Sequence, residues 1–166
     1  PHSMQDSLDL QRDYHSVLAR QVLALLPNLA ETNADSGGEL LASWDQRLEA
    51  DSAAAALWSV WYNRQLNPAL GRHLSHTLAQ SDTPPTNEPL STLTVLEVLA
   101  TPEGQALAIT SLREAWAATE LLLGKDSDQW QWGDLHRIVL EHPLLQRAKG
   151  ALAEQMRIKD YPRGGS

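Results

Sequence analysis

The stretch DSAAAALWSVWYNRQL, residues 51–66, carries the clearest helix signal in the chain. Asp51 or Ser52 can cap its start by accepting a hydrogen bond from an unpaired backbone N–H, and the alanines at 53–56 favour helix intrinsically. The apolar residues after them recur at helical spacing, so they line one broad apolar face. The stretch therefore indicates a helical fold. Its apolar face holds Leu57, Trp58, Trp61, Tyr62 and Leu66.

On the C-terminal side, this helix is expected to stop or kink at Asn67-Pro68, because the residue before a proline avoids the helical region. It can then resume to about Leu78. Residues 80–89 (QSDTPPTNEP) contain three prolines and almost no apolar side chains, which is typical of an exposed linker. The sequence therefore predicts a first helical lobe over residues 1–79, a Pro-rich linker over 80–89 and a second helical lobe over 90–166.

Within the first lobe, residues 14–26 repeat apolar side chains at helical spacing, and Pro27 follows where a helix cannot continue. Residues 31–38 (ETNADSGG) form a loop by composition. A short helix over residues 40–48 is expected next. The apolar faces are Tyr14, Val17, Leu18, Val22, Leu25 and Leu26 in the first of these helices, opposite His15, Arg20 and Gln21, and Leu40, Leu41, Trp44 and Leu48 in the second.

In the second lobe, residues 90–100 are expected to be helical, and Thr101-Pro102 starts a long helix that ends before Gly124. Residues 136–142 do not hold a helical period, so a short extended segment is predicted there. A final helix over residues 144–156 is weakened by Gly150. The fold class is therefore all-α, an irregular array of about six helices. The apolar stripe of the long helix is Ile109, Leu112, Trp116 and Leu123, flanked by Ala108, Ala115 and Leu122.

Composition excludes several classes of function. The chain has 166 residues with a net charge of −8, and only Lys149, Arg157, Lys159 and Arg163 gather loosely. Nucleic-acid binding needs clustered cations to displace counterions, so no nucleic-acid partner is expected. No run approaches the ~20 apolar residues of a membrane span, so no membrane partner is expected either. Cysteine is absent, which excludes disulfides, thiolate metal sites and a cysteine nucleophile.

Two groups of polar residues are candidates for reactive sites. His73 and His76 lie three residues apart and can face one metal ion on a helix, but no further ligand follows at a recognisable spacing. Asp134, His136 and His142 share a face if their segment is extended, which suggests the orienting half of a general-base pair. No nucleophile adjoins them and the chain has no G-x-S-x-G turn. Surface histidines and a Trp-packed turn explain these groups better than metal binding or catalysis.

The six tryptophans invite a similar choice. They could line an aromatic ligand pocket or a sugar platform, but at helical spacing such side chains more often form core, because each has a large apolar area to bury. The chain contains no phenylalanine, so the large aromatic packing groups must be tryptophans. A core role is therefore expected for Trp44, Trp58, Trp61, Trp116, Trp130 and Trp132.

A set of short motifs resembles the β chain of the penicillin acylase (penicillin amidase) family of N-terminal-nucleophile hydrolases. The densest is WQWGDLH at 130–136, followed by HPL at 142–144. Residues 41–62, residues 11–16 (QRDYHS) after His2-Ser3, and residues 161–166 (YPRGGS) resemble other elements of that chain in the same order. Both ends look cut, so the chain is expected to be a fragment of a larger αββα hydrolase.

The resemblance implies a mechanism whose parts lie elsewhere. Family members cleave linear amide bonds with a Ser at the start of the β chain, whose own α-amine acts as base, and backbone N–H groups with an Asn form the oxyanion hole. Here Pro1 comes first and Ser3 is not in the nucleophile's motif. No catalytic, cofactor-binding or metal-binding residue is carried over; family members often bind calcium elsewhere in the chain. The oxyanion-hole Asn is matched by none of Asn28, Asn33, Asn63, Asn67 and Asn87.

Two functional classes follow. The first is a scaffold segment, inactive alone, whose partners are the α chain and the nucleophile-bearing part of the β chain. Its location would be periplasmic or extracellular if it follows the family. An isolated fragment of this kind is expected to expose apolar surface and to form homo-oligomers. The alternative is an autonomous helical protein-interaction module without enzymatic activity.

Overall fold

The computed structural model describes residues 3, 14–32, 37–78, 90–138 and 161–165. The described part is mostly helical, so the predicted all-α class is confirmed. No helix in the described ranges is long and apolar enough to cross a membrane. In chain order the elements are α2 (Val17–Ala24), α3 (Leu29–Thr32), α4 (Gly38–Ala42), α5 (Ala53–Val60), the π-helical η2 (Trp61–Leu66), α6 (Asn67–Leu78), α7 (Thr92–Leu99), α8 (Pro102–Leu123), the 3-10 turn η3 (Ser127–Gln129), α9 (Trp132–Leu135), β1 (Arg137–Ile138) and β2 (Tyr161–Pro162).

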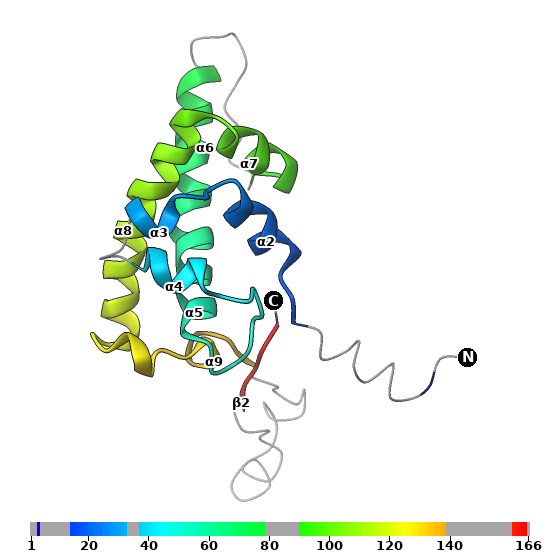
Figure 1. The fold of residues 1–166 in the computed structure, drawn as a ribbon, viewed down its shortest axis with the longest axis vertical. Helices are drawn as coiled ribbons and strands as arrows, with labels where there is room; N and C mark the ends of the chain where they lie inside the picture. Colours follow the sequence, from blue (N-terminus) through cyan, green and yellow to red (C-terminus); the bar gives the residue numbers. More distant parts are fainter. Residues whose placement is uncertain (1–2, 4–13, 33–36, 79–89, 139–160, 166) are drawn as a thin grey trace, which may run out of the picture.

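The long rod formed by α5, η2 and α6 is the centre of the molecule, and α8 runs beside it in the opposite direction (Figure 1). Ser52 caps the start of α5 by accepting from Ala55 N–H, as expected. Inside the rod, Trp61 is fully buried and its indole Nε1–H donates to Ser111 Oγ of α8 at 2.9 Å. This bond joins the two longest helical elements through the middle of the core.

The chain stays helical through Asn67-Pro68, so the expected stop is wrong, and the kink expected as its alternative stays a prediction. A proline lacks an N–H, and its ring clashes with the carbonyl four residues earlier when the helix is a regular α-helix. Here the wider π-helical segment η2 precedes it, and Asn67 N–H bonds to Tyr62 O, five residues back. The change of helical type makes room for Pro68, and α6 continues to Leu78 as predicted.

The buried core draws on helices from both sides of the segment at residues 79–89. Trp61 and Leu57 of the rod pack in the same cluster as Ala108 and Leu112 of α8. The expected linker itself lies outside the described residues, so the division into two lobes stays a prediction. The core role of the tryptophans is confirmed, because Trp116 packs against the core and the others are buried: Trp44, Trp58, Trp61, Trp130 and Trp132.

Helix α8 is as predicted at both ends. Thr101 caps it by accepting from Gly104 N–H, Pro102 is the first helical residue, and Gly124 ends it with a positive φ. Its buried face differs in part, because Ser111 and Thr119 are buried while Leu122 is 44% exposed. The buried face consists of Gly104, Ala108, Ser111, Leu112, Ala115 and Thr119.

Other boundaries also differ. The helix expected over residues 40–48 ends at Ala42. Trp44 and Leu48 are still buried, but they lie in irregular chain and not in a helix. Val17, expected on the apolar face of α2, is 56% exposed. Part of the expected loop at 31–38 is helical, since α3 runs to Thr32 and α4 starts at Gly38.

The Trp-rich stretch contains one helical turn, α9, that the sequence did not predict. It leads into β1, which pairs antiparallel with β2, with Arg137 opposite Pro162 and Ile138 opposite Tyr161. The predicted extended segment is therefore confirmed at residues 137–138. Its remainder, residues 139–142, and the helix predicted over 144–156 lie outside the described residues.

Candidate functional site

Segments that are far apart in sequence meet at one place, which we call the junction: residues 14–16, 46–50, 132–137 and 161–165. Tyr14–Ser16 lies antiparallel to Gln46–Leu48, with Ser16 N–H bonded to Gln46 O and Leu48 N–H to Tyr14 O, both at 2.9 Å. Gly165 N–H donates to Leu48 O at 2.8 Å, and Trp132 Nε1–H donates to Gly165 O at 3.0 Å. The junction is therefore held mainly through backbone groups.

Two glycines allow the close approach of these segments. Gly133 N–H bonds to Ala50 O at 2.7 Å, and a Cβ at this position would lie 2.5 Å from Cβ of Pro162. A Cβ at Gly164 would lie 2.7 Å from Leu48 O. Any larger residue would push the segments apart, so Gly133 of WQWGDLH and Gly164 of YPRGGS have a steric reason.

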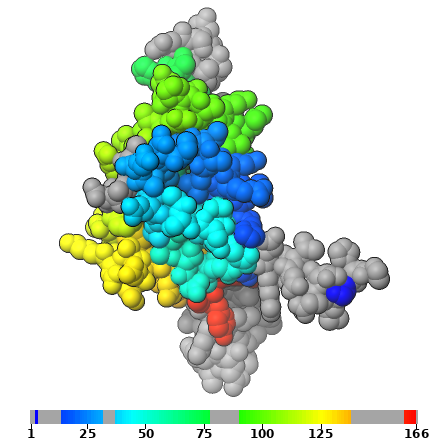
Figure 2. Space-filling model, in the orientation of Figure 1, coloured from blue at the N-terminus to red at the C-terminus, as the bar shows by residue number. Residues whose placement is uncertain are grey.

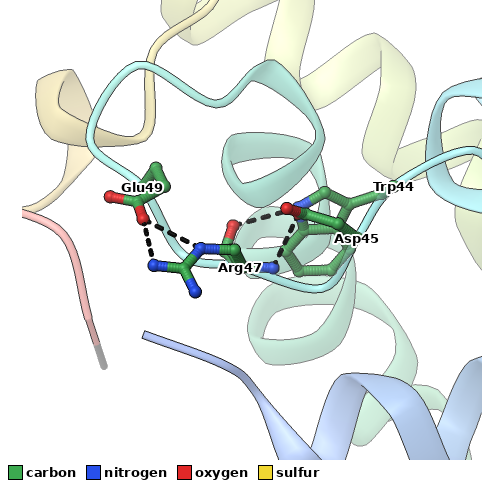
Figure 3. A network of polar contacts seen from close by, with 4 residues as sticks. All are labelled: Trp44, Asp45, Arg47 and Glu49. Atoms are coloured by element: carbon green, nitrogen blue, oxygen red, sulfur yellow. Dashed lines mark hydrogen bonds and ion pairs between the residues drawn. The ribbon is translucent and has the colours of Figure 1, made fainter. Parts of the chain in front are cut away.

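A compact polar network shapes the 44–49 part of the junction (Figure 3). Arg47 N–H donates to Asp45 Oδ1 at 3.0 Å, while Trp44 Nε1–H donates to Arg47 O at 3.0 Å. Arg47 Nη2 lies 2.7 Å from Glu49 Oε1 in a partly exposed ion pair. Gln46 adopts a φ of 61°, which a helix cannot accommodate. These bonds explain why the chain leaves the helical path after α4 and why Trp44 still reaches the core.

An open pocket of about 560 Å³ lies at the junction. Its floor is aromatic and apolar, because Trp58, Tyr62 and Trp132 are each at most 9% exposed. None of the described residues that line it is Asp, Glu, Lys or Arg, so its walls carry no fixed charge. The lining comprises Tyr14, His15, Ser16, Val17, Leu18, Leu48, Trp58, Ser59, Tyr62, Asn63, Trp132, His136 and Gly165.

The aromatic rings of the pocket are packed against one another. Trp58 stacks on Tyr62 with ring centroids 5.2 Å apart, and Trp132 stacks on His136 at 4.9 Å. Burial raises the pKa of Tyr62 above its ordinary 10.0, while a hydrogen bond to the Asn67 side chain opposes part of the rise. The phenol therefore stays neutral at physiological pH and is a hydrogen-bonding group, not a charged one.

The acid–histidine group considered from the sequence does not assemble as a general base. Asp134 lies on α9 and its Oδ1 accepts from Arg137 Nη2 at 2.9 Å. His136 Nδ1 lies 3.0 Å from Arg163 O. Because a carbonyl only accepts, Nδ1 carries the proton in this bond, which leaves Nε2 as the acceptor in the neutral ring. His142 lies outside the described residues.

The histidine pair on α6 stands apart from the junction. His73 is half-buried and its carbonyl accepts from Thr77 Oγ1, while His76 is exposed near the end of the helix. In the ranges that the structure describes, no group of three or more His, Cys, Asp or Glu could hold a metal ion. The arrangement fits two surface histidines.

The serine hydroxyls with resolved bonds serve local structure. Ser16 caps α2, Ser52 caps α5 and Ser91 caps α7, each by accepting a backbone N–H three residues on. Ser111 is buried between Trp61 Nε1 and the Ala108 carbonyl. A capping hydroxyl that already accepts a backbone N–H, or one enclosed in the core, is poorly placed to attack a substrate.

Sequence reasoning did not find the pocket. Ser59 and Asn63 come from the central rod, His15 from the segment before α2 and Gly165 from the last described residues. No local spacing links them, because they meet only through the junction. The available signal was the set of motifs at 11–16, 41–62, 130–136 and 161–166. Of their described residues, the junction brings together 14–16, 46–50, 132–136 and 161–165.

Comparison with known proteins agrees with those motifs. No curated protein matches the chain. The sequence profile of the family described as Penicillin amidase, however, matches residues 1–166, the full length of the sequence. This chain therefore belongs to the penicillin amidase family.

Proposed function

We propose that this chain is a scaffold segment of a penicillin acylase-like amidohydrolase. In this proposal the parent enzyme hydrolyses a linear amide bond with an N-terminal Ser that lies outside the chain, and the segment is inactive alone. Its role is to pack as a helical body against the α chain and the nucleophile-bearing part of the β chain.

One observation carries the proposal. The motifs that resemble the family converge at the junction, and their polar groups form hydrogen bonds and ion pairs that hold the junction together. Trp132 Nε1 bonds to Gly165 O, Arg47 pairs with Glu49, and Ser16 caps α2. Gly133 is required by close packing on Ala50 and Pro162. These residues serve the shape of the junction, which is what a scaffold requires.

The chemistry points the same way. In an N-terminal-nucleophile hydrolase the serine uses its own α-amine as the base, so only a terminal serine can perform the reaction. Ser16, Ser52 and Ser91 have their Oγ atoms committed to helix caps, and Ser111 is buried in the core. His136 lines the pocket with its Nδ1 bonded to Arg163 O, and no hydroxyl among the described residues is bonded to its ring.

The test compares two proteins on one substrate. The purified 166-residue chain should not hydrolyse a chromogenic acyl amide, whereas the parent precursor, once matured, should. Replacing the terminal Ser of the parent by Ala should abolish turnover, because the nucleophile is removed. Hydrolysis by the pure chain would show that the reacting group lies within it and would refute the proposal.

A second candidate is an autonomous helical interaction module. The observation that favours it is exposed apolar surface away from the junction, since Leu121 is 89% and Leu93 is 67% exposed. The reading frame of the gene separates the two candidates. A Ser-led β-chain start upstream and a strand-rich continuation downstream support the scaffold, and a short self-contained frame supports the module.

A further inference from the structure

The chain enters and leaves its helical body at one place. Tyr14 comes before α2 and Gly165 follows β2, yet both bond to the backbone of Leu48, through its N–H and its carbonyl respectively. Figure 1 shows the segment before α2 close to the C-terminus, and Figure 2 shows residues 161–165, in red, against the cyan residues that include Leu48. Anything that continues from either side of the body therefore starts at the junction.

The pocket lies at this same place. Tyr14 and Gly165 both line it, as does Leu48 between them. A charged group entering the pocket would lose its hydration without meeting an opposite fixed charge, which is costly. An uncharged, largely apolar side chain would bury its surface against Leu48, Trp58 and Trp132, which is favourable. Ser59, Asn63 and His136 add polar groups to the same walls. The lining therefore favours an uncharged and largely apolar occupant.

Exposed apolar side chains flank the pocket. Val17, which lines the pocket, is 56% exposed, although the other large apolar residues of α2, Leu18, Val22 and Leu23, are partly or fully buried. Tyr161, on β2 within the junction but outside the pocket lining, is 61% exposed. Large side chains left in water next to an apolar pocket are typical of a surface that another protein segment covers.

We infer that the junction face, defined as the pocket together with Val17 and Tyr161, is the surface that docks on the remainder of the chain's own precursor, with an uncharged apolar side chain of that remainder in the pocket. The inference rests on the proposed function, which supplies the remainder. Because the remainder would be linked through the segments at Tyr14 and Gly165, its effective concentration at this face is high. A modest apolar anchor is then enough to hold it.

The test uses single cysteines, because the chain contains none. Val17→Cys and Tyr161→Cys report on the junction face, and Leu93→Cys is the matched control, since it is 67% exposed on α7 near the other end of the molecule (Figure 1). Each variant is placed in the parent precursor and in the isolated chain, and maleimide labelling of its peptide is followed by mass spectrometry. Circular dichroism checks that each variant is folded.

In the precursor, labelling at positions 17 and 161 should slow by roughly tenfold or more relative to the isolated chain, because a covered thiol reacts only when the interface opens. Labelling at position 93 should be unchanged. Equal reactivity of Val17→Cys in the two proteins would overturn the inference. Protection of Leu93→Cys to the same degree would also overturn it, since the cover would then not be confined to the junction face.

A second pair of variants tests the pocket itself. Asn63→Trp should fill the mouth and restore labelling at Val17→Cys in the precursor, whereas Arg64→Trp, one residue on and exposed but outside the lining, should not. Persistent protection with Asn63→Trp would refute the apolar anchor. The labelling readout does not depend on turnover. If Val17→Cys and Tyr161→Cys are protected in a precursor that lacks amidase activity, the proposed function is refuted and the docking face is supported.

Discussion

The hydrogen bond between Trp61 and Ser111 provides the sharpest test of how the core is held together. Trp61 lies in η2 and Ser111 in α8, and the indole Nε1–H donates to the hydroxyl at 2.9 Å with both side chains buried. The hydroxyl in turn donates to the Ala108 carbonyl at 3.0 Å. We consider Ser111→Ala, Trp61→Phe and the double variant, with Thr110→Ala as the control.

The expected costs follow from what each change leaves unpaired. Ser111→Ala leaves a buried indole N–H without an acceptor, which costs about 2 kcal/mol of unfolding free energy. Trp61→Phe removes the donor but also leaves a smaller ring in a fully buried site, for about 2–3 kcal/mol. With the indole gone, Ser111→Ala should cost less than about 0.5 kcal/mol, because no buried donor is stranded. The coupling between the two sites is therefore about 1.5 kcal/mol.

The assay is urea unfolding followed by far-UV circular dichroism. The slope of the transition is checked for constancy across the five proteins, which are the unaltered chain, the three variants of the cycle and the control. Thr110, next to Ser111 but exposed, bonds its hydroxyl to the Ala106 carbonyl in a similar way. Thr110→Ala should change the unfolding free energy by less than about 0.5 kcal/mol. If Ser111→Ala costs the same in the Trp61→Phe variant as in the unaltered chain, the bond contributes nothing and the argument fails.

Three further predictions follow from other contacts. Gly104→Ala should destabilise the protein by about 3 kcal/mol or more, because its Cβ would lie 2.0 Å from Val98 O. Gly71→Ala should instead stabilise α6 by about 0.5–1 kcal/mol, because a Cβ there would have nothing within 4 Å. Equal melting temperatures for the two variants in thermal unfolding would refute this. Thr101→Ala should cost about 1 kcal/mol through loss of the α8 cap, while Thr101→Ser should restore it. Because the pKa of Tyr62 is raised in the folded state, stability should fall as pH rises above about 10, and Tyr62→Phe should flatten that decline in pH-dependent urea unfolding.

The features predicted well from sequence are those with a local physical cause. The start and end of α8 depend on Thr101, Pro102 and Gly124, whose capping roles need no information about the rest of the chain. The burial of tryptophan likewise follows from its large apolar area. The motif order identified the family because it needs no knowledge of how the segments meet.

Two of the errors occurred where side chains bond to backbone. The helix expected over 40–48 ends early because the Asp45 carboxylate and the Trp44 indole bond to the backbone of Arg47, and these bonds compete with helix formation. On α8, Ser111 and Thr119 are buried because each hydroxyl donates to a carbonyl of its own helix. A hydropathy pattern counts such residues as polar and places them at the surface.

The candidate site was beyond prediction for a different reason. The junction assembles from segments more than twenty residues apart in the chain, and the residues joined by the bond from Trp132 to Gly165 are separated by 33. The motifs marked each segment as unusual but did not say that they touch. Asp134 and His136 were paired on the assumption of an extended chain, and the helical turn α9 directs them to Arg137 and to Arg163 O instead.

The double attachment of Leu48 has a mechanical consequence. Its N–H is bonded to Tyr14 O and its carbonyl to Gly165 N–H. The two arms of the polypeptide, one ending at Tyr14 and the other at Gly165, are therefore held by the same residue. Tension applied along the two arms is carried first by these two hydrogen bonds. The rod and α8 carry no force until the bonds break. Strain between the two arms is therefore taken up at Leu48 while the helical body keeps its shape.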